Sequence, residues 1–207
     1  IPLRCQYLTA FIDVHDKLLF YVVCGWEEDF TGYIVDYGTY PDQKRLQFTL
    51  RKAQKTLSSV SPGMEKEGAI QAGLENLCRD LLFREFNRSG GAAMRIDRML
   101  IDCGYMPGII ENVRHKLGVA SVMASKGVGI KASNKPMSTY RRKPGERYGQ
   151  NWYIPNVNRT NEFPHVAIDT NYWKTFCHER LQTADGDRGS ITLFGKSPNQ
   201  HRLFAEH

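Results

Sequence analysis

The sequence has no Cys-x-x-C pair, no long apolar run and no low-complexity tract. Its five cysteines are widely spaced and odd in number, which argues against a disulfide framework or a zinc knuckle and favours a reducing compartment. No apolar run approaches the roughly 20 residues that a membrane-spanning helix needs. The first residues lack the basic segment and apolar stretch of a signal peptide. We therefore expect no membrane partner.

What the sequence does contain is an ordinary globular composition. The 207 residues are 41% hydrophobic and 24% charged, so the chain can bury a sizeable core. A length of this order fits one large domain or two small ones.

Positive charge is concentrated in one segment. The chain has 28 Lys and Arg against 22 acids, a net charge of +6. The window from residue 126 to 147 holds seven basic residues and one acid, Glu146, and therefore the whole excess. Such a concentration predicts a polyanion-binding loop, and the alternative is a solvated loop without a binding role. The basic residues are Lys126, Lys131, Lys135, Arg141, Arg142, Lys143 and Arg147.

Hydrophobic patterning predicts an α/β fold. Three apolar runs separated by polar turns predict an antiparallel meander, and later apolar runs alternate with amphipathic segments. We expect strands at 7–14, 18–26, 30–37, 99–101, 119–124, 166–169 and 190–194, and helices at 70–86, 107–117 and from about 173 to 181. Residues 43–60 have ambiguous helical spacing, and residues 201–207 are expected to form a short tail.

These elements predict a mixed central sheet with helices on both faces. One domain over residues 1–207 suffices, with a basic loop or hairpin insertion at about 126–165 and a hairpin strand at 152–154. Trp152 and Tyr153 are expected to pack within that hairpin rather than stack on bases.

Three acids follow apolar strands: Asp13, Asp102 and Asp169 each come directly after an isoleucine. Ligand sites in open α/β sheets lie at the carboxyl ends of strands, and carboxylates that converge there repel unless a cation neutralises them. Oxygen ligands favour Mg²⁺ or Mn²⁺, and two such ions about 4 Å apart support phosphodiester hydrolysis. The alternative is that each acid is a turn former or helix cap.

Two other acids are weaker candidates. Asp97 begins its strand and is interpreted as a turn former, and Asp36 is either a fourth acid near the site or an edge residue.

A family resemblance supports the catalytic interpretation. Residues 8–16, Leu-Thr-Ala-Phe-Ile-Asp-Val-His-Asp, resemble the opening strand of the nuclease domain of large terminase subunits of lambda-like tailed phages, where the segment reads approximately Leu-Thr-Ala-Gly-Val-Asp-Val-Gln-Asp. Phe11 and His15 depart from that pattern, and residues 43–91 look expanded. Further similar stretches, in the correct order, are Gly25-Trp26, residues 34–38, Ile101-Asp102-Cys103-Gly104-Tyr105, Ser125-Lys126-Gly127, and Ile168-Asp169-Thr170 with Lys174 and Arg180-Leu181.

The resemblance implies an RNase H-like fold of the resolvase and integrase type, and a two-metal endonuclease that cuts double-stranded concatemeric DNA with Mg²⁺ or Mn²⁺. Asp13 and Asp102 would bridge or flank the ions, and Asp169 would complete the site. Lys126 would contact the scissile phosphate or remain solvated. The other basic residues of the 126–147 window would bind DNA, with Arg141, Arg142 and Lys143 gripping the duplex backbone.

The resemblance also implies partners: an ATPase domain, a small terminase subunit and a portal, in the cytoplasm of a bacterial host. No G-x-x-x-x-G-K-[ST] motif is present, so we expect the ATPase motor to be absent from these residues. Two alternatives remain, a resolvase- or transposase-like nuclease and a non-catalytic nucleic-acid-binding module.

Overall fold

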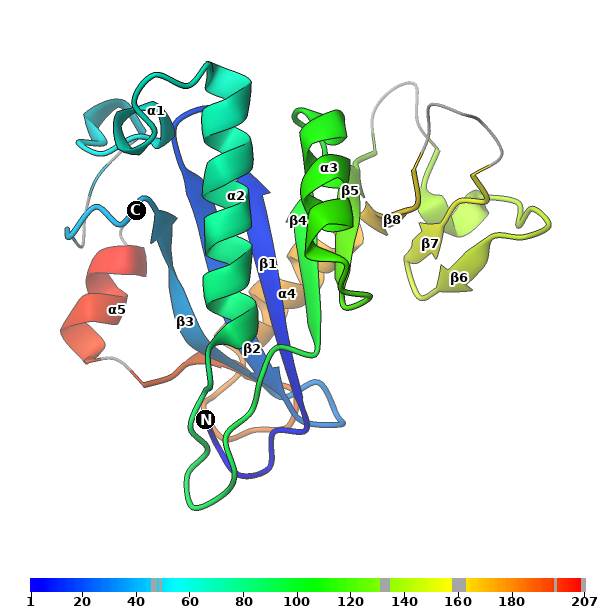
Figure 1. The fold of residues 1–207 in the computed structure, drawn as a ribbon. Coiled ribbons are helices and arrows are strands. Elements are labelled where there is room, and N and C mark those ends of the chain that lie inside the picture. The colour runs from blue at the N-terminus through cyan, green and yellow to red at the C-terminus, as the bar shows by residue number, and fades with distance from the viewer. Residues whose placement is uncertain (46–47, 49, 131–134, 158–162, 196, 206–207) are drawn as a thin grey trace.

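Nine strands form one mixed sheet in the computed structural model, which describes residues 1–45, 48, 50–130, 135–157, 163–195 and 197–205 (Figure 1). The elements, in chain order, are β1 (Tyr7–Val14), β2 (Leu19–Trp26), β3 (Gly32–Tyr40), the 3₁₀ turn η1 (Leu50–Lys52), α1 (Leu57–Val60), α2 (Lys66–Phe83), β4 (Arg98–Asp102), α3 (Pro107–Leu117), β5 (Val122–Val128), the 3₁₀ turn η2 (Met137–Thr139), β6 (Arg147–Gly149), β7 (Trp152–Ile154), β8 (His165–Asp169), α4 (Thr170–Gln182), β9 (Ile191–Leu193) and α5 (Pro198–Ala205).

The strand order is β6-β7-β8-β5-β4-β1-β2-β3-β9. Strands β1, β2 and β3 form the predicted antiparallel meander, and β4, β5 and β8 extend the sheet in parallel with β1. The predicted α/β class with a mixed sheet is confirmed. In such a sheet the carboxyl ends of β1, β4, β5 and β8 lie at one edge, which is where a ligand site is expected.

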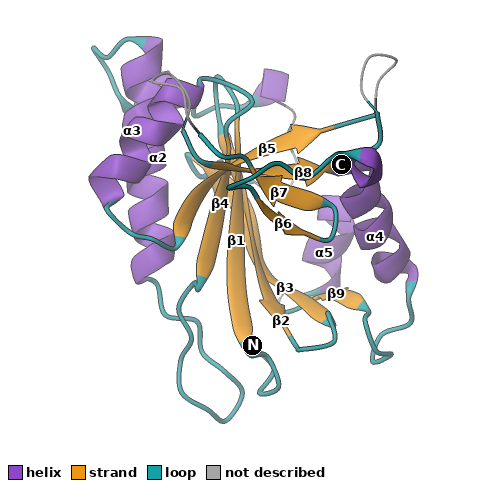
Figure 2. Ribbon diagram, turned by 90° about the vertical axis from the view of Figure 1, so that its right-hand side faces the viewer, coloured by secondary structure: helices purple, strands orange, loops and turns teal. Residues whose placement is uncertain are grey.

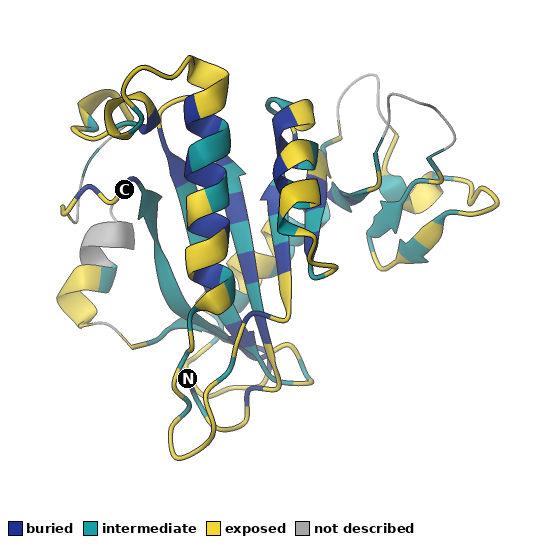
Figure 3. Cartoon of the chain, viewed as in Figure 1, coloured by how far each residue is buried: buried dark blue, intermediate teal, exposed yellow. Residues whose placement is uncertain are grey.

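Helices cover both faces of the sheet, but unequally (Figure 2). Helices α2 and α3 lie on one face, and α4 and α5 lie on the other. Every second residue of β1 from Leu8 to Val14 is buried, and these side chains join the core with Ile70 and Leu74 of α2. Figure 3 shows buried residues recurring between exposed ones along α2. Helix α4 has no fully buried residue, so the second face is the more open one.

Local signals explain the element bounds that match the prediction. Pro107 occupies the first turn of α3, and Gly118 ends it with a φ of 61°, a left-handed conformation that glycine adopts without strain. Strands 7–14 and 152–154 also match the predicted bounds.

Three local predictions differ from the structure. The described part of 43–60 is mostly irregular because the buried Gln43 side chain accepts a hydrogen bond from the Gln54 backbone and donates one to the Lys55 carbonyl. The strand predicted at 119–124 begins later, at Val122, because the chain turns after α3. The predicted tail is wrong: α5 forms instead, with His201 Nδ1 lying 3.1 Å from the Tyr37 hydroxyl.

Asp97 fixes the start of β1. Its carboxylate accepts a hydrogen bond of 2.7 Å from the backbone N–H of the buried Leu8. Replacing Asp97 with alanine leaves that N–H without its partner, so we expect the free energy of unfolding to fall by about 1–3 kcal/mol. Asp97→Asn keeps an acceptor and should lose less. Urea unfolding followed by circular dichroism measures both variants, and an unchanged midpoint for Asp97→Ala would contradict this role.

Candidate active site

Asp13 and Asp102 lie side by side at the carboxyl ends of β1 and β4. Ile12 pairs with Ile101 in this parallel ladder, so the next residue of each strand projects from the same face of the sheet. Both acids line one hollow of about 460 Å³. The other lining residues are Val14, His15, Asp16, Lys66, Gly104 and Tyr105. The structure therefore brings these two acids together, as the strand-end argument expects.

The two carboxylates are accessible and held by short local contacts. Asp13 Oδ2 lies 3.0 Å from His15 Nε2, and the Asp13 side chain is 48% exposed. The His15 ring packs edge-on against Phe20. Asp102 Oδ1 accepts a hydrogen bond from the Gly104 backbone at 3.1 Å. Both side chains are thus oriented, yet each keeps oxygen lone pairs for a ligand.

The hydroxyl of Ser125 lies on the strand next to Asp102. Ser125 pairs with Asp102 in the β4–β5 ladder and is 1% exposed. Its Oγ is buried and has no hydrogen-bond partner among the described residues. Buried hydroxyls normally have a partner, so an orphaned one on the strand next to Asp102 fits a nearby site for a hydrated, hard divalent cation. The described residues contain no group of three or more His, Cys, Asp or Glu side chains arranged to hold a metal.

Asp169 is placed differently from the other two acids. It ends β8, is buried, and caps α4 by accepting a hydrogen bond of 3.1 Å from the Tyr172 backbone. Asp169 pairs with Val128, three residues beyond Ser125. Because side chains alternate along a strand, this register places Asp169 on the face opposite Asp102. The structure does not place it in the hollow, and its metal-binding role stays a prediction.

Asp36 belongs to an internal network of β2, β3 and α2. Its Oδ2 forms an ion pair of 2.7 Å with Arg84 and accepts a hydrogen bond from the Tyr21 hydroxyl. Burial, followed by the charge of Asp36, raises the pKa of Tyr21 to about 12. Asp36 is absent from the residues that line the hollow, and its ion pair with Arg84 joins β3 to the end of α2.

Most of the predicted DNA-binding residues are exposed. Lys126 lies on β5 outside the hollow, and Lys131 falls outside the described residues. None of the exposed cations on the described part of this segment forms an ion pair with a described carboxylate. These cations are Lys126, Lys135, Arg141, Arg142, Lys143 and Arg147.

The predicted hairpin is present and is anchored to α4. Strands β6 and β7 pair with each other, and β7 adds to β8. Tyr148 and Tyr153 stack with ring centroids 5.8 Å apart, which supports packing within the hairpin. At its turn, the Asn151 carbonyl accepts hydrogen bonds from the Asp169 backbone at 2.9 Å and from Trp173 Nε1 at 3.1 Å.

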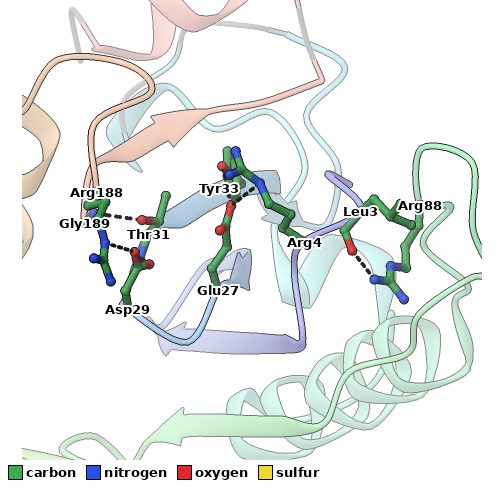
Figure 4. A network of polar contacts seen from close by, with 9 residues as sticks. All are labelled: Leu3, Arg4, Glu27, Asp29, Thr31, Tyr33, Arg88, Arg188 and Gly189. Carbon is green, nitrogen blue, oxygen red and sulfur yellow. Dashed lines mark hydrogen bonds and ion pairs between the residues drawn. The ribbon is translucent and has the colours of Figure 1, made fainter.

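A second hollow lies at the other end of β1 and has balanced charge (Figure 4). Arg4 pairs with Glu27 at 3.6 Å, and Arg188 pairs with Asp29 at 2.9 Å. Hydrogen bonds from Thr31 and Arg188 lower the pKa of Asp29 to about 2. The second hollow therefore has acids and arginines in equal number, whereas acids predominate in the first.

Sequence reasoning assigned no role to three residues that line the first hollow. Lys66 precedes Asp102 by a long stretch of chain, so no local motif links the two. His15 and Tyr105 lie inside the quoted similar stretches, and the nearness of each to a strand-end acid was the available signal.

Comparisons with known proteins give one family. The family model described as "Terminase large subunit gpA, endonuclease domain" matches residues 1–207. No curated protein matches the chain. A solved structure of the Ppx/GppA protein family, the Aquifex aeolicus member, is similar at 8% identity with a TM-score of 0.28, over 85% of this chain and 61% of that chain. A likeness this weak carries no argument. Among the described helices, none is long and apolar enough to span a membrane.

Proposed function

Because the chain belongs to the family of terminase large subunit gpA endonuclease domains, we propose that it cuts double-stranded DNA by metal-dependent phosphodiester hydrolysis. The observation that carries this proposal is the pair Asp13 and Asp102, adjacent on neighbouring parallel strands and open to one hollow. Two adjacent, accessible carboxylates at the carboxyl ends of strands are a suitable binding site for Mg²⁺ or Mn²⁺.

The roles of the chain's own residues follow from their placement. Asp13 and Asp102 would hold the divalent ion, which supplies Lewis acidity and an activated water when bound. His15 orients Asp13, and the Gly104 backbone orients Asp102. The two-ion form of the proposal adds Asp169 from the start of α4, where its carboxylate now caps the helix.

We also assign the fold to the RNase H-like class. The support is the antiparallel meander β1–β3, joined through β1 to the parallel strands β4 and β5, with the paired acids at the ends of β1 and β4. In this proposal the substrate is concatemeric phage DNA in the bacterial host. The family suggests an ATPase domain, a small terminase subunit and a portal as partners.

A second candidate function is non-catalytic binding of nucleic acid. The observation that favours it is the position of Asp169, which lies outside the hollow as an N-cap. This alternative keeps the basic segment and needs no bound metal.

Plasmid digestion with Mg²⁺, Mn²⁺, Ca²⁺ or EDTA tests the proposed function. We expect nicking and linearisation with Mg²⁺ or Mn²⁺ and none with EDTA. Mn²⁺ should also raise the melting temperature, because an ion that binds only the folded state stabilises it by about 2.7 kcal/mol at 100 times its Kd. Binding without cutting, and without a metal-induced shift, would favour the non-catalytic module. Selective cutting of a four-way junction would instead indicate a resolvase.

A further inference from the structure

The hollow that contains Asp13 and Asp102 has walls of opposite charge. Asp13, Asp16 and Asp102 come from the ends of β1 and β4, whereas Lys66, at the start of α2, supplies the only cationic side chain among the described lining residues other than the titratable His15. Lys66 is exposed and forms no ion pair with a described carboxylate. Its ammonium group contacts Tyr105 and, with three N–H donors, can also donate to an anion that enters the hollow.

Packing of α2 fixes where Lys66 lies. Ala69, Ile70 and Leu74 are fully buried against the sheet, so the first turn of α2 is held rigidly at the edge where β1 and β4 end. Glu65 precedes the helix and makes no side-chain capping hydrogen bond. The positive end of the helix dipole lies at the same end of α2 as Lys66, together with the carboxylates of Glu65 and Glu67.

Tyr105 orients the lysine. The Lys66 Nζ lies 5.5 Å from the centroid of the Tyr105 ring, a distance typical of a cation held by an aromatic side chain. Tyr105 follows Asp102 by three residues and lines the same hollow. A tyrosine, an ammonium group and three carboxylates therefore surround one space.

This arrangement matches the charges of a phosphodiester on a metal ion. Asp13 and Asp102 would hold an ion that neutralises part of the charge of a bound phosphate, and a donor on the opposite wall would neutralise the rest. We propose that Lys66, oriented by Tyr105, binds the non-bridging oxygens of the phosphodiester that is cut. The inference rests on the proposed nuclease function and adds a phosphate-binding residue that lies outside the basic 126–147 segment.

The test compares Lys66→Gln and Tyr105→Phe with Lys52→Gln, which removes an exposed charge outside the hollow. We expect Lys66→Gln to reduce plasmid cleavage with Mn²⁺ by about a hundredfold and Tyr105→Phe to reduce it less. Lys66→Arg should recover part of the activity because it keeps the charge. Lys52→Gln should cut like the wild type.

Two further measurements separate this inference from the proposed function. The Mn²⁺-induced rise in melting temperature should be unchanged in Lys66→Gln, because Lys66 does not hold the metal. Duplex binding in Ca²⁺ at several salt concentrations should show a slope shallower by about 0.9, the value for one lost phosphate contact.

The outcomes are distinct. Wild-type cleavage and an unchanged salt slope in Lys66→Gln would overturn the role of Lys66, even if the wild type is a metal-dependent nuclease. If none of the metal ions supports cleavage by the wild type, the proposed function fails. The salt dependence of duplex binding then decides alone whether Lys66 contacts a phosphate.

Discussion

Replacing Asp13 or Asp102 with asparagine should abolish Mn²⁺-dependent DNA cleavage while the chain stays folded. Asparagine keeps the size of the side chain but removes the charge that holds the ion. We expect a loss of at least about a hundredfold, because even residues that only support metal ligands cost ten- to a hundredfold when replaced. Removing one of two adjacent like charges should leave the metal-free melting temperature unchanged or higher. Plasmid nicking and thermal melting with and without Mn²⁺ measure these effects.

Asp185→Asn is the matched control, since Asp185 is an exposed acid outside the hollow. Cleavage by Asp13→Asn at the wild-type rate would show that the active-site assignment is wrong.

Asp169→Asn tests whether Asp169 binds the second ion. Asparagine is as good an N-cap as aspartate, so α4 should stay capped, and lost cleavage at unchanged stability would indicate that Asp169 binds the second ion.

Replacing Arg141, Arg142 and Lys143 with alanine should weaken DNA binding for all sequences alike. If the basic segment contacts roughly 4 to 6 phosphates, log affinity falls with log salt at a slope of about −4 to −5. The triple variant should make that slope shallower by up to about 3. Binding of one duplex at several salt concentrations measures it, and residual cleavage should keep its metal dependence.

The control for this variant is Arg51→Ala, Lys52→Ala and Lys55→Ala combined. These three residues are exposed and precede α2 in the sequence, whereas the basic segment follows it. The control lowers the net charge of the protein by the same amount at another surface. It therefore distinguishes the loss of phosphate contacts from the effect of a lower net charge. Equal slopes in the wild type and the Arg141, Arg142 and Lys143 variant would show that the segment is a solvated loop.

Much of the architecture is predictable because local signals and burial agree. Strand β1 alternates its buried residues, and α3 has a proline near its start and a glycine at its end. The adjacency of Asp13 and Asp102 follows from the rule that parallel strands end at one edge of the sheet. Their catalytic role is a separate matter, which cleavage by the asparagine variants will decide.

The features that the sequence could not predict depend on long-range packing. Lys66 reaches the hollow because the buried face of α2 sets the axial position of the helix. Helix α5 is different, because Ser197, Pro198 and Gln200 are local start signals that the prediction of a tail did not use; the helix also contacts β3 through His201 and Tyr37. The position of Asp169 depends on the register between β5 and β8. Asp102 pairs with Ser125 of β5, whereas Asp169 pairs with Val128, three residues further along the same strand.

The double hydrogen bond at Asn151 makes the hairpin and α4 one mechanical unit. One carbonyl oxygen at the hairpin turn accepts from the backbone of Asp169 and from the indole of Trp173. A displacement of the turn therefore has to stretch these bonds or move the start of α4 with it. If the basic segment next to this hairpin binds a duplex as proposed, a force on the hairpin turn is transmitted to Asp169, the residue that caps α4. The position of the hairpin turn and the position of Asp169 are therefore coupled through the Asn151 carbonyl.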